Sequence, residues 1–76
     1  MTSEELKQEI AEHKFAKPKE WRDGQFVFNY INCVYGELAR AVQFNDNVDC
    51  FYNDSEINKF IDCCVKRINE YERRNK

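Results

Sequence analysis

Hydrophobic positions along the chain recur every three or four residues, which is the spacing of one face of an α-helix. The pattern predicts an N-terminal helix (1–14), a connector (15–22), a central helix (23–44), a loop rich in acidic residues and asparagine (45–53) and a C-terminal helix (54–74). No period-two alternation, as in a β-strand, competes with it. We expect an all-α fold, a small three-helix domain in which the central and C-terminal helices pack antiparallel and the N-terminal helix docks more weakly.

The central segment is apolar over more than half of its helical circumference. At 100° per residue, one face is expected to belong to the core. Its members are Val27, Ile31, Val34, Tyr35, Leu38, Ala41 and Val42. A second apolar flank holds Phe26, Tyr30, Cys33 and Phe44. A helix of this kind is either surrounded by other helices or keeps one flank for a partner.

The other two helices carry signals at their starts. Thr2 and Glu5 stand at the spacing of a capping box, and behind them Leu6 and Ile10 form only a thin apolar stripe, with His13 as a half-buried residue at its edge. In the C-terminal helix, the capping-box spacing recurs at its start and lysine and arginine concentrate towards its end, which suits the helix dipole. Its expected core positions are Ile57, Phe60, Ile61, Cys64, Val65, Ile68 and Tyr71.

Length and composition limit the class of protein. The chain has 76 residues, of which 42% are hydrophobic, 34% charged and 14% aromatic, and its net charge is −2. These values predict one folded domain spanning 1–76 and argue against disorder. No apolar run is long enough to span a membrane, and the acidic N-terminus lacks the pattern of a signal peptide. We therefore expect a cytoplasmic protein.

Four cysteines are expected to be free thiols in a reducing cytosol. Cys63 and Cys64 are adjacent, no C-x-x-C motif occurs, and a zinc site would need Cys33, Cys50 and His13 to converge with one of that pair. Packing as small hydrophobic residues is the favoured interpretation. Cys64 projects towards the predicted core. Cys63 lies on the basic side of the helix, where neighbouring lysine and arginine are expected to favour its thiolate.

The loop between the second and third helices has some features of an EF-hand. Five of its residues occupy ligand positions 1, 3, 5, 9 and 12 of the twelve-residue calcium loop. They are Asn45, Asn47, Asp49, Asn53 and Glu56. However, position 1 normally holds aspartate, and Cys50 stands where the sharp turn requires glycine. We predict an asparagine-rich turn leading into a capped helix, with no metal.

Charge is distributed unevenly along the chain. Residues 1–22 are neutral, residues 23–56 carry a net charge of −5, and residues 57–76 carry +3. The basic side of the C-terminal helix therefore suggests nucleic-acid binding as an alternative function. Its candidate residues are Lys59, Lys66, Arg67, Arg73 and Arg74. Since the whole chain is acidic and acids are mixed into this helix, a solvated face is the favoured interpretation.

Catalysis has little support in the sequence. The chain contains no glycine-rich phosphate loop, no G-x-S-x-G, no H-E-x-x-H and only one histidine. We expect neither an enzyme nor a cofactor-binding protein.

Aromatic residues give the strongest functional lead, because a two-helix core needs fewer of them. Either the N-terminal helix and the connectors cover them, or they form an exposed patch of the kind that binds proteins. The candidate partner-binding residues are Trp21, Phe26, Tyr30, Cys33, Phe51 and Tyr52. The flank formed by Phe26, Tyr30 and Cys33 is the first choice, since the thin N-terminal helix is expected to cover it poorly.

A further pattern runs through residues 18–61. It reads Pro18-x-x-Trp21-Arg22-x-Gly24-Gln25-x-x-Phe28-Asn29, then Leu38-Ala39, then Asp49-Cys50-Phe51-Tyr52-x-Asp54, and Phe60. This resembles a family of small uncharacterised proteins encoded by phages and prophages, whose pattern is roughly W-R-x-G-Q-x-x-F-N, L-A and D-P-F-Y-x-D. Cys50 stands where that family has proline. The resemblance implies a genomic setting and no mechanism.

The sequence thus predicts a small, non-enzymatic, phage-type accessory protein that acts by protein–protein interaction. Its partner is expected to be a host protein or a second copy of the chain, with no membrane involved. The alternative is a nucleic-acid-associated protein that uses the basic side of the C-terminal helix.

Overall fold

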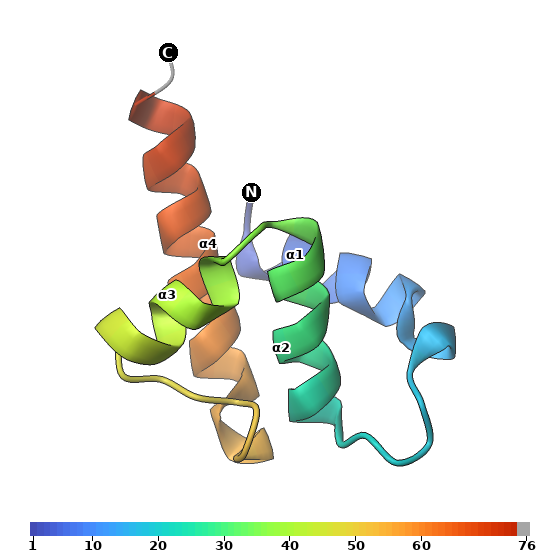
Figure 1. Cartoon of the computed structure of the whole chain (residues 1–76). Coiled ribbons are helices and arrows are strands. Elements are labelled where there is room, and N and C mark those ends of the chain that lie inside the picture. Colours follow the sequence, from blue (N-terminus) through green and yellow to red (C-terminus); the bar gives the residue numbers. More distant parts are fainter. Residues whose placement is uncertain (75–76) are drawn as a thin grey trace.

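The computed structural model describes residues 1–74, and all of its regular structure in that range is helical (Figure 1). The α-helices are α1 (Ser3–Glu12), α2 (Asp23–Val34), α3 (Leu38–Asn45) and α4 (Ile57–Arg74). Two short 3₁₀ turns, η1 (Lys14–Ala16) and η2 (Asp54–Glu56), precede α2 and α4. The predicted all-α class is confirmed. No helix within these residues is both long and apolar enough to cross a bilayer.

The capping box predicted for α1 is present. The Oγ1 atom of Thr2 accepts a hydrogen bond from the backbone N–H of Glu5 at 3.1 Å, and the Glu5 carboxylate accepts one from the N–H of Thr2 at 3.1 Å. Leu6 and Ile10 are buried behind this cap, as the stripe predicts. His13 is exposed rather than half-buried, because α1 ends before it.

The predicted central helix (23–44) is wrong as a single element, because it breaks at Gly36. This glycine has a φ of +67°, in the left-handed region that glycine adopts without strain, and it separates α2 from α3. The change of direction also moves Val34 out of the core. Its side chain is 53% exposed, although the helical pattern predicts it to be buried.

The break decides how the helices run relative to one another. At its start, α2 lies beside the start of α4, where the N–H of Gly24 donates to Asp54 Oδ1 at 3.1 Å. At its end, Tyr35 lies beside Ile68 of α4. These two helices therefore run in the same direction (Figure 1). The sequence predicts an antiparallel pair here. Helix α3 crosses α4, because both of its ends lie against the same turn of α4: Leu38 lines a groove with Ile68, and Asp46 meets Arg67.

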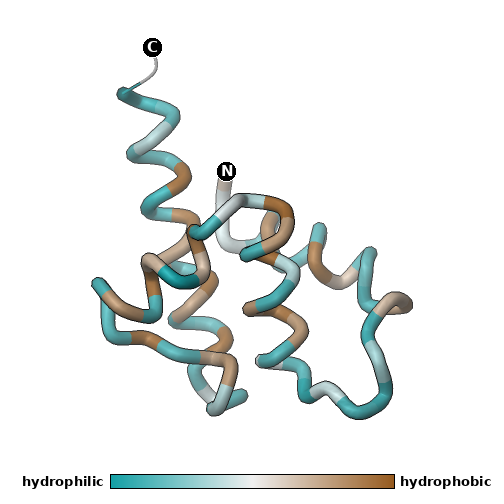
Figure 2. The backbone as a smooth tube through the Cα atoms, in the orientation of Figure 1, coloured by the Kyte–Doolittle hydropathy of each residue, from teal (hydrophilic) through white to brown (hydrophobic). Residues whose placement is uncertain are grey.

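A single hydrophobic core lies between the four helices and the loop before α4. Its buried members are Leu6, Ile10, Phe26, Val27, Phe28, Ile31, Ala39, Val42, Val48, Cys50, Phe60, Ile61, Cys64 and Val65. Along each helix, hydrophobic positions alternate with hydrophilic ones (Figure 2). Phe28, which the helical pattern leaves outside the core face, packs against Phe60 with ring centroids 5.8 Å apart.

Candidate protein-binding groove

The flank predicted as the contact surface is covered by α1. Phe26 is buried, at 7% exposure. The hydroxyl of Tyr30 donates to Glu9 Oε2 at 2.8 Å, and the ring of His13 lies 5.2 Å from the ring of Tyr30. Cys33 is exposed, and so is Phe44, at 77%, which the helical pattern places on the same flank but which lies beyond the break, in α3. The expectation that the N-terminal helix covers the flank poorly is therefore wrong, because polar contacts supplement its thin apolar stripe.

The remaining predicted residues lie around the loop before α4 and the connector. Phe51 is half-buried and packs edge-on against Phe28, with centroids 5.4 Å apart. Tyr52 is 74% exposed and stands against Phe51 at 4.8 Å. Trp21 is half-buried against the core. Phe51 and Trp21 therefore cover the core, and only Tyr52 of these three side chains offers an exposed surface.

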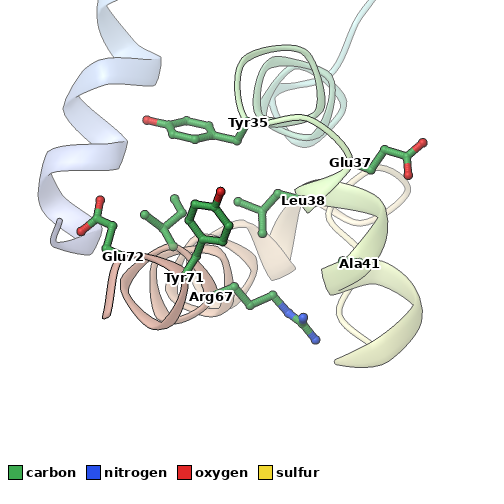
Figure 3. Close-up of a pocket in the computed structure, with 8 residues that line it drawn as sticks. Tyr35, Glu37, Leu38, Ala41, Arg67, Tyr71 and Glu72 are labelled. Carbon is green, nitrogen blue, oxygen red and sulfur yellow. The ribbon is translucent and has the colours of Figure 1, made fainter. Parts of the chain in front are cut away.

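An apolar groove of about 670 Å³ opens between the α2–α3 turn and the C-terminal half of α4 (Figure 3). Leu38, Ala41 and Ile68 supply aliphatic surface, and the rings of Tyr35 and Tyr71 stand on opposite sides of it. Tyr71 is 70% exposed. Charged residues also line the groove, and they are Glu37, Arg67 and Glu72. Its volume lies in the range of ligand-binding clefts, about 300–1,000 Å³.

The groove exists because α4 is longer than the helix that packs against it. The 18 residues of α4 extend about 27 Å, whereas the 8 residues of α3 extend about 12 Å. The apolar stripe of α4 therefore continues past α3, and Figure 1 shows α4 projecting beyond the rest of the domain. Ile68 and Tyr71, both predicted as core residues, line an open surface instead.

Sequence reasoning missed this groove, although a signal was present. The apolar stripe of the C-terminal helix continues to Tyr71, while the helix that packs on it is shortened by the break at Gly36. A glycine in the middle of a predicted amphipathic helix is a weak sign of such a break. The apolar stripe of the C-terminal helix is longer than the shortened helix that packs on it. This comparison predicts that the last turn of the stripe lies outside the core.

The Arg67 charge at the groove is already paired. Its Nε and Nη2 atoms donate to the two carboxylate oxygens of Asp46, each at 2.9 Å, in a bidentate pair. This hydrogen bonding holds the pKa of Asp46 below its usual range. Within residues 1–74, Glu37 and Glu72 take part in no ion pair. The unpaired charge lining the groove is therefore negative.

Tyr35 is held in place by a contact on its far side. Its hydroxyl donates to the carboxylate of Glu9, at 2.9 Å from Oε1 and 3.0 Å from Oε2. Burial, followed by the hydrogen bond to Glu9, raises the pKa of Tyr35 to about 12. Glu9 also binds Tyr30, so one carboxylate of α1 fixes two tyrosines of the α2 segment. The Tyr35 ring is thus a fixed wall of the groove, and its polar atom is satisfied elsewhere.

The basic residues of α4 are interrupted by acidic ones. Arg67 is engaged by Asp46, while Lys59, Lys66, Arg73 and Arg74 are exposed. Asp62, Glu70 and Glu72 lie among them on the same helix. The arrangement is the mixed, solvated face that the sequence favours.

The predicted loop between α3 and α4 uses its polar side chains for local structure. Asp49 Oδ1 accepts the N–H of Phe51 at 2.8 Å, and Asn53 Oδ1 accepts the N–H of Ser55 at 3.1 Å, which caps η2. No cluster of three histidine, cysteine or acidic side chains suited to a metal ion occurs in the described part of the chain. This geometry agrees with the predicted asparagine-rich turn.

The four thiols have different environments. Cys33 is exposed, Cys63 is half-buried, and Cys50 and Cys64 are completely buried. Burial raises the pKa of both Cys50 and Cys64 to about 12. The expectation that basic neighbours favour the Cys63 thiolate is wrong, since burial and then Asp46 raise the pKa of this thiol.

Comparison of the chain with protein-family models, with curated proteins and with solved structures gives no match. The resemblance of residues 18–61 to phage and prophage proteins thus remains an expectation from the sequence.

Proposed function

We propose that this chain is a non-enzymatic protein-binding module that holds its partner in the groove between α3 and α4. The observation that carries the proposal is the continuation of the α4 stripe, at Ile68 and Tyr71, past the end of α3. An aromatic side chain that is 70% exposed beside aliphatic residues has the composition of an interaction hot spot.

The genomic setting that the resemblance implies supports an accessory role in phage or prophage biology, with a host protein as partner in the cytoplasm. This step is an analogy and does not depend on the groove.

The proposal is tested by site-specific photo-crosslinking in cells that express the chain. A benzophenone amino acid is placed at Tyr71 in one variant and at Tyr52 in a matched control, because both tyrosines are exposed to a similar extent, 70% and 74%. We expect a discrete crosslinked partner from position 71 only, and loss of this product when Ile68→Asp is added to the same chain. Equal products from both positions, or none from position 71, would contradict the proposal.

Nucleic-acid binding is the second candidate, supported by the exposed Lys59, Lys66, Arg73 and Arg74 on α4. It is less favoured because Arg67 is paired with Asp46 and the unpaired charges lining the groove are acidic. A salt titration of binding to single-stranded and duplex DNA separates the two functions. Micromolar affinity that falls steeply as salt increases would place nucleic acid first.

A further inference from the structure

We propose that the occupant of the groove is a short amphipathic helix whose apolar face is flanked by lysine or arginine. This inference rests on the proposed function, and it adds the secondary structure and the charge of the partner segment. It follows from what the groove offers: apolar walls, few available polar groups, and carboxylates at its rim.

The shortage of available polar groups favours a helix over an extended peptide. An extended peptide needs hydrogen-bond partners for its backbone, which are usually supplied by the edge of a β-sheet. Residues 1–74 contain no strand. The hydroxyl of Tyr35 is bound to Glu9 and the guanidinium of Arg67 to Asp46, so neither is available to a peptide backbone. A helix satisfies its own backbone and needs only an apolar surface on which to lay one face.

The dimensions of the groove fit about one and a half turns of helix. The part of α4 that lines it runs from Arg67 to Glu72, five steps of about 1.5 Å each. Such a length accommodates two large apolar side chains at positions i and i+3 or i+4 of the occupant. The facing rings of Tyr35 and Tyr71 are placed to enclose these anchors (Figure 3).

The charge of the occupant follows from the two unpaired carboxylates. Glu37 comes from the start of α3 and Glu72 from the last turns of α4, and Figure 3 shows them on opposite sides of the groove. A third carboxylate, that of Glu9, lies behind Tyr35. Cationic side chains on both flanks of the occupant would complement this field, whereas acidic flanks would be repelled.

A second copy of the chain fits this groove less well. In a two-fold symmetric pair, the same surface is contributed by both copies. Glu37 and Glu72 would then be present twice at one interface, and their charges would repel each other. Charge complementarity thus favours a different chain as the partner.

The test is selection from a displayed library of helical peptides in which the apolar positions vary and the flanking positions encode lysine, arginine, glutamate or glutamine. Peptides are selected on the wild-type protein. Those that also bind the Tyr71→Glu variant are then discarded, because they bind outside the groove. We expect enrichment of basic flanks. The double variant Glu37→Lys/Glu72→Lys should weaken the selected peptides at least about tenfold, equivalent to 1.4 kcal/mol. The control Glu20→Lys/Glu70→Lys changes the net charge equally outside the groove lining, and it should change affinity less than about twofold.

The outcomes separate the inference from the function on which it rests. Peptides that depend on Tyr71 but carry acidic flanks, or are indifferent to the Glu37/Glu72 reversal, would overturn the inference and leave the groove as a binding surface. An absence of any Tyr71-dependent peptide would count against both. Sedimentation of the protein alone completes the test: a dimer that Tyr71→Glu dissociates would make a second copy the occupant and would overturn the inference.

Discussion

The Cα of Gly24 lies directly against the backbone of Cys50, so that a Cβ built on this glycine would stand only 2.0 Å from the Cys50 carbonyl oxygen. In return, the Cys50 thiol donates to the carbonyl oxygen of Gly24 at 3.3 Å. The first turn of α2 and the loop before α4 are therefore in backbone contact. This contact fixes the start of α2 near the start of α4, and together with Tyr35 beside Ile68 at the other end it gives the two helices a common direction.

Gly24→Ala is expected to destabilise the protein strongly. The added methyl group meets backbone atoms, which cannot rotate away as a flexible side chain can, and overpacking of this kind costs about 1–3 kcal/mol. Urea denaturation followed by circular dichroism measures the loss. A variant as stable as wild type would show that the loop moves freely away from α2.

Gly36→Ala is expected to destabilise the protein for a different reason. Nothing lies within 4 Å of a Cβ at this position, but the φ of +67° strains any residue other than glycine, by about 1–2 kcal/mol. Gly36→Asn should cost less, because asparagine tolerates the left-handed region. If alanine and asparagine are equally costly in the same denaturation experiment, strain at the α2–α3 turn is not the cause.

Alkaline pH is expected to weaken the attachment of α1. The pKa values of Tyr30 and Tyr35 are raised to about 12 by burial and by the Glu9 hydrogen bonds. Since these values exceed the value of about 10 for an unfolded tyrosine, their contribution is fully present below pH 10 and is lost as pH rises through 12. The double variant Tyr30→Phe/Tyr35→Phe should be less stable than wild type at pH 8, and its stability should fall less between pH 10 and 12. Parallel pH profiles would contradict this assignment.

Cysteine reactivity should follow exposure. Cys33 is exposed, Cys63 is half-buried, and Cys50 and Cys64 are completely buried with a pKa raised to about 12. Because the thiolate is the reactive form, native alkylation followed by peptide mass spectrometry should label Cys33 first, Cys63 more slowly and the buried pair only on unfolding. Labelling of Cys64 before Cys63 would contradict the orientation of α4.

Truncation of Tyr71 should have little effect on stability, in contrast to truncation of a core residue. Ile31 is completely buried, and Ile31→Ala is expected to cost about 2–5 kcal/mol. Tyr71 is 70% exposed, and Tyr71→Ala is expected to cost less than about 1 kcal/mol. Comparable losses in chemical denaturation would mean that the end of α4 belongs to the core in solution.

The helical class and most of the core follow from periodicity, because the apolar stripes of α2 and α4 repeat over enough turns to be unambiguous. The capping box at Thr2 is likewise local and readable. The break at Gly36 was missed, since the hydrophobic pattern continues through it in helical phase from Ile31 to Leu38. Periodicity shows which residues share a face, and it does not show whether the helix axis continues.

The covering of Phe26 and Tyr30 was missed for a different reason. The apolar stripe of α1 is thin, and sequence reasoning weighed only that stripe. Glu9, on the polar side of the pattern, supplies the decisive contacts by accepting hydrogen bonds from both Tyr30 and Tyr35. Interactions between side chains that are 21 and 26 positions apart are not encoded in any local pattern.

The attachment of α1 has a consequence for the order in which the molecule assembles. The hydrogen bonds that tie α2 and α4 to the loop between α3 and α4 link residues 21 to 30 positions apart, whereas α1 returns to α4 through Ser3 and Asp62, which are 59 positions apart and joined by a 2.5 Å hydrogen bond. Closing the longer segment costs more chain entropy. α1 should therefore join last during folding and detach first in the native state, as the least stable cooperative unit. Its amide protons would exchange with solvent before those of α4. Each detachment would also expose Phe26 and Tyr30 to solvent for a short time.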